Sequence, residues 1–529
     1  MYGKVYSACL HGVDGQLIEV EVDISRGLPH FSIVGLPDSA VRESMERVRA
    51  AIKNCGFTFP LERITVNLAP ADLRKEGAAF DLAIAVGILL TSGQLRWPEH
   101  SVRSTLIIGE LALDGAVRPV PGVLPMVDIA RYKGMKAVLL PQYNVLEAEL
   151  IPDVAAVGLV HLQQLAGTEG VGGLGASSGR ETSPAAEEAA GPRTVSAGAE
   201  GERQPWAEDF GDVVGQHHAK RALLIAAAGM HNILLIGPPG SGKTMMARRL
   251  PGILPVLSDE ESLQVTKVYS AAGKMPARTG LIRLRPFRAP HHTTSAGGII
   301  GGGAIPKPGE VSLAHHGVLY LDELPEFPRH VLEVLRQPLE DRSVTVSRAK
   351  AVFTFPAHFM LAASMNPCPC GFYGANIDSK PCGCTPLRIG QYLSKLSGPL
   401  LDRIDMHVEV PRVEPGEAAS LPQAAGCSSA DLRGMIAGAV EIQKQRYAGE
   451  PIRFNSELSG SLLRKHCQLP AEGRQLLNSS VAALGLSMRA YDRILKLART
   501  IADLEGGQAL TTAHIAEALQ YRCLDKAVF

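Results

Sequence analysis

The sequence carries no net charge, no long hydrophobic run and no secretion signal at its start. Its 53 Lys and Arg residues are balanced by 53 Asp and Glu residues, so the protein as a whole offers no basic surface to nucleic acid. The longest apolar stretch, LAIAVGILL at 82–90, is far shorter than the roughly 20 residues that span a bilayer. The opening MYGKVYSACLHGVDG lacks the apolar segment that signal peptides carry. We therefore expect a cytoplasmic protein without a membrane partner, in which any contact with nucleic acid comes from local loops.

Length and composition indicate a globular protein with more than one domain. The 529 residues are 46% hydrophobic and 20% charged, which is enough for two or three domains with separate cores. No internal repeat is visible. Residues 166–205 are mostly Gly, Ala, Ser and Glu with almost no large apolar side chain, and such a segment cannot bury enough surface to order itself. It predicts a disordered linker between an N-terminal domain at 1–165 and a larger C-terminal part.

Four of the nine cysteines fall in one short stretch, NPCPCGFYGANIDSKPCGC at 366–384. Disulfides are not expected in a reducing compartment, and four thiolates can close a tetrahedral zinc site. The C-x-C spacing of both pairs departs from the commoner C-x₂₋₄-C, and the alternative is four free thiols, as we expect for the five scattered cysteines. We favour zinc, in a structural role because no ligand position is left open for water. The predicted ligands are Cys368, Cys370, Cys382 and Cys384.

The strongest functional signal is HNILLIGPPGSGKTMMARRL at 231–250. An apolar strand is followed by the pattern G-x-x-x-x-G-K-T and then by a helical run, which is the context of a phosphate-binding loop. The glycines let backbone N–H groups approach phosphates at a helix N-terminus. Lys243 would reach the β- and γ-phosphates, and Thr244 would ligate Mg²⁺. The predicted ATP-binding residues are Gly237, Pro238, Pro239, Gly240, Ser241, Gly242, Lys243 and Thr244.

Two further apolar runs end in polar side chains suited to the same site. In GVLYLDELPEF at 317–327, a buried strand would deliver Asp322 and Glu323 to the carboxyl edge of a parallel sheet. We expect Asp322 to hold Mg²⁺ and Glu323 to polarise the attacking water, although a strand that ends in two acids is often only solvated. FMLAASMNP at 359–367 ends similarly, in Asn366, which can contact the γ-phosphate and the water.

Several fragments together resemble one known family. They are GPPGSGKT, FRAPHHTTSAGGIIGGGAIPKPGEVSLAHHGVLYLDELPEF, FPAHFMLAASMNPCPCG and SGPLLDRIDMHVEV. The chain resembles the magnesium-chelatase-like AAA+ ATPases of the YifB/ComM type over nearly its whole length except the linker. The resemblance implies that Asn366 is the first sensor, Arg403 an arginine finger supplied across a subunit interface, and Arg489 the second sensor. It also implies a hexameric ring that moves on DNA and promotes branch migration in recombination and natural transformation, with recombination proteins as possible partners.

The expected fold class is α/β, with four segments. Residues 1–165 resemble a Lon-protease-like α/β domain, and 166–205 form the linker. An AAA+ core with a parallel sheet would occupy 206–412, and a helical lid, including an amphipathic helix at 486–504, would occupy 413–529. In Lon-type proteases a nucleophilic serine follows the glycine of the segment that corresponds to KEGAAFDLAIA. Here Gly77 is followed by Ala78 and Ala79, so we expect the fold without peptidase activity.

The predicted DNA contacts are local. LEDRSVTVSRAKAVFTFPAHF at 339–359 predicts a hairpin with a polar tip at 347–350, and related ring motors project a hairpin from this place into the pore. Copies of Arg348 and Lys350 in a ring would concentrate positive charge in a narrow channel. The alternative is an exposed hairpin whose charges only prevent edge-to-edge aggregation. The second candidate for single-stranded or branched DNA is the Gly-rich segment that contains His291, His292 and Lys307.

The sequence contains three adjacent histidine pairs, at 217–218, 291–292 and 315–316. Adjacent side chains diverge on a strand and do not share a helix face, so we do not expect these pairs to bind metal. The functional prediction is an ATPase with ATP, Mg²⁺ and structural Zn²⁺ that acts on DNA as a homohexameric ring. The alternatives are a chelatase-like ATPase that remodels proteins and a nucleotide-dependent scaffold with little turnover.

Overall fold

The chain forms two compact units. The computed structural model describes residues 1–73, 75, 77–173, 208–275, 280–303, 306–348, 351–374, 381–412, 428–522 and 524. One unit comprises residues 1–200 with 262–282, and the other comprises 201–261 with 283–529. Residues 174–205 of the predicted linker and 413–427 of the predicted lid lie outside the described residues. In the described part of the chain, no helix is long and apolar enough to cross a membrane.

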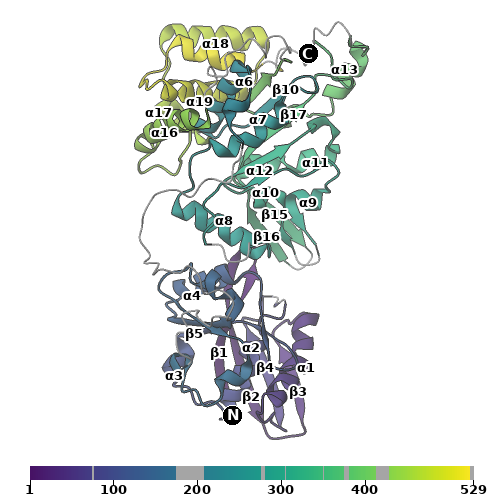
Figure 1. Ribbon diagram of the computed structural model, residues 1–529, viewed down its shortest axis with the longest axis vertical. Helices are drawn as coiled ribbons and strands as arrows, with labels where there is room; N and C mark the ends of the chain where they lie inside the picture. Colours follow the sequence, from purple (N-terminus) through teal and green to yellow (C-terminus); the bar gives the residue numbers. More distant parts are fainter. Residues whose placement is uncertain are drawn as a thin grey trace, which may run out of the picture. The chain divides into compact units, whose positions relative to one another are not determined.

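The N-terminal unit contains a mixed seven-stranded sheet in the order β3-β4-β2-β1-β5-β8-β9 (Figure 1). Its strands are β1 (Tyr2–His11), β2 (Asp14–Ser25), β3 (His30–Val34), β4 (Arg63–Ala69), β5 (Thr105–Ile107), β8 (Ala137–Pro141) and β9 (Ala155–Leu159), with a small hairpin of β6 (Glu110–Leu111) and β7 (Val117–Arg118). Its helices are α1 (Ser39–Asn54), α2 (Asp81–Thr91), α3 (Glu99–Arg103), α4 (Val123–Tyr132) and α5 (Val145–Ala148).

The longest apolar run of the sequence is a core helix of this unit. Residues 81–89 of α2 are all buried, which explains why the helix is apolar on every face. Its first residue, Asp81, is fully buried and pairs with Arg47, whose Nε lies 2.7 Å from the carboxylate. Burial raises the pKa of Asp81 to about 6, and the ion pair with Arg47 opposes that shift. A helix of this kind organises the hydrophobic core of a globular domain.

The C-terminal unit is built on a five-stranded sheet in the order β11-β14-β17-β10-β18, in which all neighbouring strands are parallel. The strands are β10 (Ile233–Ile236), β11 (Phe287–Arg288), β14 (Val318–Leu321), β17 (Met360–Met365) and β18 (Met406–Glu409). The three apolar runs expected to be buried strands are therefore strands of one sheet. Residues on β10, β14 and β17 are buried throughout, as parallel strands covered on both faces require. The predicted α/β fold class is confirmed.

Helices cover this sheet and continue into a C-terminal helical region (Figure 1). Around the sheet lie α6 (His217–Gly229), α7 (Lys243–Arg249), α9 (Ala296–Ile300), α10 (Glu310–Leu313), α11 (Arg329–Val334), α12 (Arg336–Asp341), α13 (Pro386–Leu393) and α14 (Gly398–Leu401), while α8 (Asp259–Ala271) starts in this unit. The C-terminal helices are α16 (Ser429–Arg446), α17 (Gly460–His466), α18 (Ala471–Leu484), α19 (Met488–Leu504) and α20 (Thr512–Gln520). The predicted amphipathic helix at 486–504 is thus confirmed as α19.

Two hairpins extend from the C-terminal unit. Strands β15 (Ser343–Arg348) and β16 (Ala351–Pro356) pair antiparallel over their whole length, which confirms the predicted hairpin. Its tip at 349–350, and with it Lys350, lies outside the described residues, and Arg348 is the last residue of β15. Lys307 is exposed in the second hairpin, formed by β12 (Gly301–Gly302) and β13 (Lys307–Pro308).

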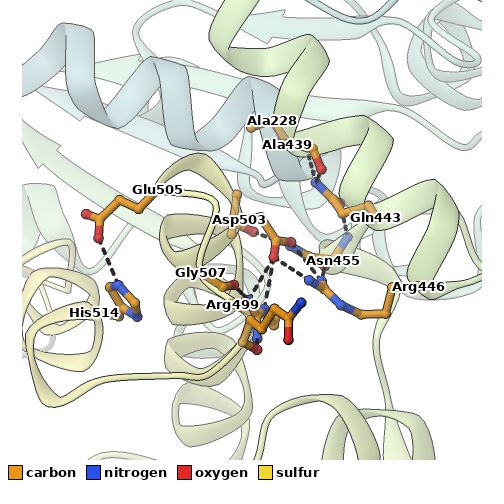
Figure 2. Close-up of polar contacts among 12 residues, drawn as sticks. Ala228, Ala439, Gln443, Arg446, Asn455, Arg499, Asp503, Glu505, Gly507 and His514 are labelled. Atoms are coloured by element: carbon orange, nitrogen blue, oxygen red, sulfur yellow. Dashed lines mark hydrogen bonds and ion pairs between the residues drawn. The ribbon is translucent and has the colours of Figure 1, made fainter.

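A buried polar network holds the C-terminal helices together (Figure 2). Asp503 of α19 accepts hydrogen bonds from Arg446 of α16 at 2.8 Å, from Asn455 at 2.9 Å and from Arg499 at 3.1 Å. Gln443 of α16 donates to the carbonyl oxygen of Ala228 in α6, which ties these helices to the sheet domain. Arginines on a helix usually line a solvated face, yet Arg499 is buried because a buried carboxylate needs paired charge.

Candidate active site

The Gly-rich loop runs from the carboxyl end of β10 to the start of α7. The backbone N–H of Gly237 donates to the carbonyl oxygen of Met365, at the end of β17, at 3.2 Å. A Cβ atom at Gly237 would lie 2.1 Å from the carbonyl oxygen of Val410, so only glycine fits between the neighbouring strand ends. Gly240 and Gly242 have φ angles of 77° and 88°, a region that glycine adopts without strain. The loop conformation therefore depends on these glycines.

Lys243 is folded over the loop that precedes it. Its Nζ donates to the carbonyl oxygens of Gly237 at 2.6 Å and Pro238 at 2.9 Å, and to the Oδ1 of Asn366 at 3.3 Å. Burial lowers the pKa of Lys243, while the carboxylates of Asp322 and Glu323 raise it. The structure therefore brings together the loop lysine and the polar residue that follows β17, which lie 123 positions apart in the sequence.

Thr244 and Asp322 also meet at this edge of the sheet. The Thr244 hydroxyl donates to the Oδ2 of Asp322 at 2.9 Å. Two oxygen ligands on adjacent corners of an octahedron with 2.1 Å bonds lie about 3 Å apart. The pair therefore has both the hard-oxygen chemistry and the spacing that Mg²⁺ requires of two neighbouring ligands.

Two residues that the sequence analysis missed orient this pair. Ser364 of β17 donates to the Oδ1 of Asp322. The Tyr320 hydroxyl of β14 lies 3.0 Å from the Oγ of Ser364 and 3.3 Å from the Oγ1 of Thr244, so it can donate its one proton to either oxygen. Burial raises the pKa of Tyr320 to about 12, so its hydroxyl keeps the proton that it donates. The signal for both was present, because each lies two positions before a predicted site residue and alternate residues share one face of a strand.

Glu323 begins a tight turn directly after the acid strand. Its backbone has a φ angle of 53°, in the left-handed region that non-glycine residues seldom adopt and that occurs at functional sites. Its Oε2 lies 3.8 Å from the Nδ1 of His292, and the His292 ring packs edge-on against Phe327. His292 therefore lies beside the acid that we expected to polarise water.

The expectation that paired histidine side chains diverge was wrong for two of the three pairs. The rings of His291 and His292 have centroids 4.0 Å apart, and those of the pair at 315–316 are equally close. The reason is that both pairs lie in turns, where neighbouring side chains can face the same way. The third pair opens α6, and the ring of His218 stacks on Tyr521.

Arg403 and Arg489 lie at the other edge of the sheet. They line a cavity of about 520 Å³ whose wall includes Asn232. Asn232 comes immediately before β10, whereas the phosphate-binding loop starts at Gly237, immediately after it. Because a strand rises about 3.3 Å per residue, the two edges are roughly 15 Å apart. Both arginines therefore line a cavity at the end of β10 opposite the phosphate-binding loop.

The cavity collects charges of both signs. Five cationic side chains and four carboxylates line it, namely Arg342, Arg403, Arg489, Arg493 and Lys496, and Glu340, Asp405, Glu457 and Asp492. His358 is also in the wall, and burial lowers its pKa to about 3, so it adds no positive charge at neutral pH. Arg493 pairs with the buried Asp405, and its charge helps to hold the pKa of that carboxyl well below its usual range. The cavity is therefore suited to contacts with charged groups.

The four clustered cysteines form the one group with metal-ligand geometry in the described part of the chain. Their sulfur atoms all lie within 4.8 Å of one another, with 3.3 Å between Cys368 and Cys370. A hydrogen bond from the backbone of Phe372 is the main cause that lowers the pKa of Cys370 to about 6, whereas the pKa values of Cys382 and Cys384 are raised in the same cluster. The cluster also adjoins the loop, because a Cβ atom at Gly371 would lie 2.6 Å from Pro239.

A parallel sheet that carries a Gly-rich loop and an acid strand at its carboxyl edge, followed by a helical region, defines the AAA+ class of fold. Comparison with known families agrees with this class. Residues 209–418 match the family described as "Magnesium chelatase, subunit ChlI", residues 20–144 match "Subunit ChlI of Mg-chelatase", and residues 426–522 match "Magnesium chelatase, subunit ChlI C-terminal".

Curated relatives extend the similarity to the whole chain. Competence protein ComM of Haemophilus influenzae is 43% identical over 523 residues, which cover 98% of this chain and 97% of the relative. The uncharacterized protein YifB of Escherichia coli is 42% identical over 522 residues, with 99% and 97% covered. A magnesium-chelatase 38 kDa subunit of Rhodobacter capsulatus is 27% identical over 176 residues, which are 30% of this chain and 50% of that subunit. The chain belongs to the magnesium-chelatase-like ComM/YifB family.

Proposed function

We propose that this protein is an ATPase that works as a homohexameric ring on DNA. The observation that carries the ATPase assignment is the convergence of Lys243, the Thr244–Asp322 pair, Glu323 and Asn366 at one edge of the parallel sheet. These are the positions at which phosphoryl-transfer enzymes place a phosphate-binding lysine, metal ligands and a group that orients water. The membership of the chain in a magnesium-chelatase-like family supports the same assignment.

Each residue has a distinct role in this proposal. Backbone N–H groups of the loop and the N-terminus of α7 bind phosphate oxygens, and the Lys243 ammonium exchanges loop carbonyls for the β- and γ-phosphates. Thr244 and Asp322 would hold Mg²⁺, which would supply positive charge against the phosphates. Glu323 takes the proton of the attacking water, with His292 beside it, and Asn366 positions that water against the γ-phosphate.

The two arginines support a ring. Arg403 and Arg489 line a cavity at the end of β10 opposite the phosphate-binding loop, together with Asn232 and charged groups of both signs. An arginine can stabilise the transition state of phosphoryl transfer from a neighbouring molecule. We therefore assign both arginines to the nucleotide of the next subunit, which requires an assembly in which every site meets a neighbour.

The assignment of DNA as the substrate is supported by the relatives of the chain. A relative with 43% identity over the full chain is named a competence protein, whereas the chelatase subunits match only 30% of this chain. The hairpin of β15 and β16 remains the predicted DNA-contacting element, through Arg348 and Lys350, and the exposed Lys307 with His291 and His292 is the alternative. The N-terminal unit would assist assembly or DNA contact without peptidase activity, since Ala79 and Phe80, which precede α2, carry no nucleophile.

The cysteine cluster is proposed to hold one structural zinc ion. Four sulfur atoms within 4.8 Å of one another fit a site with Zn–S bonds of about 2.3 Å, in which ligands are under 4 Å apart after slight contraction. The site would hold the chain that leaves Asn366, since Cys368 follows it by two residues. This position explains why a structural metal would be placed beside a catalytic loop.

The test is ATP turnover by the purified protein with and without single-stranded DNA. Lys243→Ala should lose nucleotide binding, and Glu323→Gln should retain binding but lose hydrolysis, because only the group that activates water is changed. Arg403→Ala should be inactive alone and regain activity when mixed with Lys243→Ala, since each variant damages a different side of a shared site. Normal turnover by Glu323→Gln would refute the assignment of the acid, and mixed rings no better than either parent would refute the contribution from a neighbour.

A further inference from the structure

Glu340 connects the two arginines that face the neighbouring subunit. It lies on α12 (Arg336–Asp341) at the cavity, and 53% of its side chain is exposed. Its Oε2 accepts a hydrogen bond from the Nη2 of Arg403, and its Oε1 lies 3.8 Å from the Nη2 of Arg489. The hydrogen bond from Arg403 is the main cause that lowers the pKa of Glu340, so the carboxylate is charged at neutral pH. One acid therefore pairs with both arginines, through a hydrogen bond with Arg403 and at ion-pair distance with Arg489.

A carboxylate in this position imitates a phosphate. Arginine presents parallel N–H donors that fit the oxygens of carboxylates and phosphates equally well. The guanidinium of Arg403 is already fixed on one side, because its Nη1 donates to the carbonyl oxygen of Pro399 at 2.7 Å. Its buried Nε has no hydrogen-bond partner among the residues that the structure describes. The Nη2 group of Arg403 is therefore the donor that Glu340 occupies and that a phosphate of the neighbour would take over.

The helix that carries Glu340 leads directly into the hairpin. Helix α12 ends at Asp341, Arg342 follows with a φ angle of 56°, and β15 begins at Ser343. Arg342 is held on three sides: its N–H donates to Pro338, its carbonyl oxygen accepts from Ala357 at 2.8 Å, and its guanidinium lies 3.0 Å from Glu457. Only Arg342 separates α12 from β15, so a displacement of α12 moves the hairpin as well.

We propose that Glu340 is a latch: its ion pairs with Arg403 and Arg489 couple the nucleotide bound to the neighbouring subunit to the position of the β15–β16 hairpin in its own chain. The carboxylate holds Arg403 and Arg489 until the γ-phosphate of the neighbour replaces it, and its release lets α12 and the hairpin move. Glu340 is a positioning residue, because it acts through the arginines and not on the reacting atoms. A half-exposed ion pair is weak enough for a more highly charged phosphate to displace it. The proposal rests on the ring ATPase proposed above.

The test compares Glu340→Gln with Glu333→Gln in the full-length protein. Glu333, on the preceding helix α11, pairs with Arg336 at 2.7 Å and does not line the cavity, so its substitution removes a surface ion pair of the same kind. Without a latch the arginines are available without competition, and kcat in the absence of DNA should rise about three- to tenfold. The KM for ATP should fall as well, because bound ATP no longer competes with the carboxylate for the two arginines. Glu333→Gln should behave like the parent.

A binding measurement tests the link to the hairpin. The affinity for single-stranded DNA is measured with a non-hydrolysable ATP analogue and with ADP. The ratio of the DNA affinity with the ATP analogue to the DNA affinity with ADP should approach one in Glu340→Gln. The same ratio should stay at the parental value in Glu333→Gln. Glu340→Asp, which keeps the charge on a shorter side chain, should restore part of the parental ratio, and thermal unfolding checks that each variant is folded.

The possible failures are distinguishable. If Glu340→Gln matches the parent in basal kcat and in the DNA affinity ratio while Arg403→Ala is inactive, the latch is refuted and the ring ATPase stands. A Glu340→Gln protein with lower kcat and a parental melting temperature also refutes the latch, because the acid would then assist the arginines. If the parent itself does not hydrolyse ATP, both proposals fail together.

Discussion

A single methyl group at Gly371 should weaken nucleotide binding without touching the nucleotide. Gly371 follows the first cysteine pair with a φ angle of 85°, and an added Cβ would lie 2.6 Å from the Cδ and 2.8 Å from the Cγ of Pro239 in the phosphate-binding loop. Gly374 has a φ angle of 74°, and a Cβ there would meet nothing within 4 Å. Gly374→Ala is therefore a matched control with the same backbone strain and no collision.

The expected loss of ATP affinity follows from the collision with Pro239, which only Gly371→Ala makes. Alanine in the left-handed region costs roughly 1 kcal/mol at either position, so this contribution cancels in the comparison. Overpacking of a rigid contact costs about 1–3 kcal/mol, and only Gly371→Ala incurs it. The strain is relieved when the loop moves away from the geometry that cradles phosphates. If it falls on the bound state, the affinity for ATP drops by about 5-fold to 150-fold relative to Gly374→Ala.

The assay is a titration of a fluorescent ATP analogue into parent, Gly371→Ala and Gly374→Ala, with thermal unfolding of each protein. We expect the two variants to melt within a few degrees of each other and to differ clearly in nucleotide affinity. Equal affinities would show that the cysteine-containing segment does not position Pro239. The reasoning that places a structural metal site beside the loop in order to stabilise it would then be wrong.

The remaining predictions concern the metal and the helical network. We expect roughly one Zn²⁺ per chain in parent protein purified without added zinc. The double variant Cys382→Ser with Cys384→Ser should lose this zinc and melt at a lower temperature. A parent protein that is metal-free and fully active would show that the four cysteines are ordinary thiols. Asp503→Asn should lower the free energy of unfolding by about 3–5 kcal/mol, because two arginines lose a buried carboxylate. Glu441→Gln is the control, because the exposed Glu441 pairs only weakly with Lys444 at 3.9 Å. In urea titrations of both variants, Glu441→Gln should change the free energy of unfolding by under about 1 kcal/mol. A similarly small effect of Asp503→Asn would contradict the role of the network.

Local sequence patterns were sufficient to predict the strands and the phosphate-binding loop of the C-terminal unit. The runs that end at Asp322 and Asn366 were predicted as buried strands because nothing polar interrupts them, and both are strands. The hairpin of β15 and β16 and the helix α19 were predicted correctly for the same reason, since alternation and helical periodicity are properties of neighbouring residues. The histidine pairs failed because the expectation assumed strand or helix geometry, and turns follow neither.

What the sequence determined by itself is therefore the chemistry: a phosphate-binding loop with Lys243, an acid strand with Asp322, and four cysteines in one short segment, each readable because its residues are close in the chain. The tertiary structure decided which of these groups meet. Thr244 and Asp322 lie 78 positions apart and share a hydrogen bond because parallel strands arranged in the order β14-β17-β10 deliver their carboxyl ends to one edge. Tertiary packing also brings Arg403 and, on α19, Arg489 to one cavity, where Glu340 pairs with both. No pattern of adjacent residues records this meeting, because it depends on how the helices pack against the sheet.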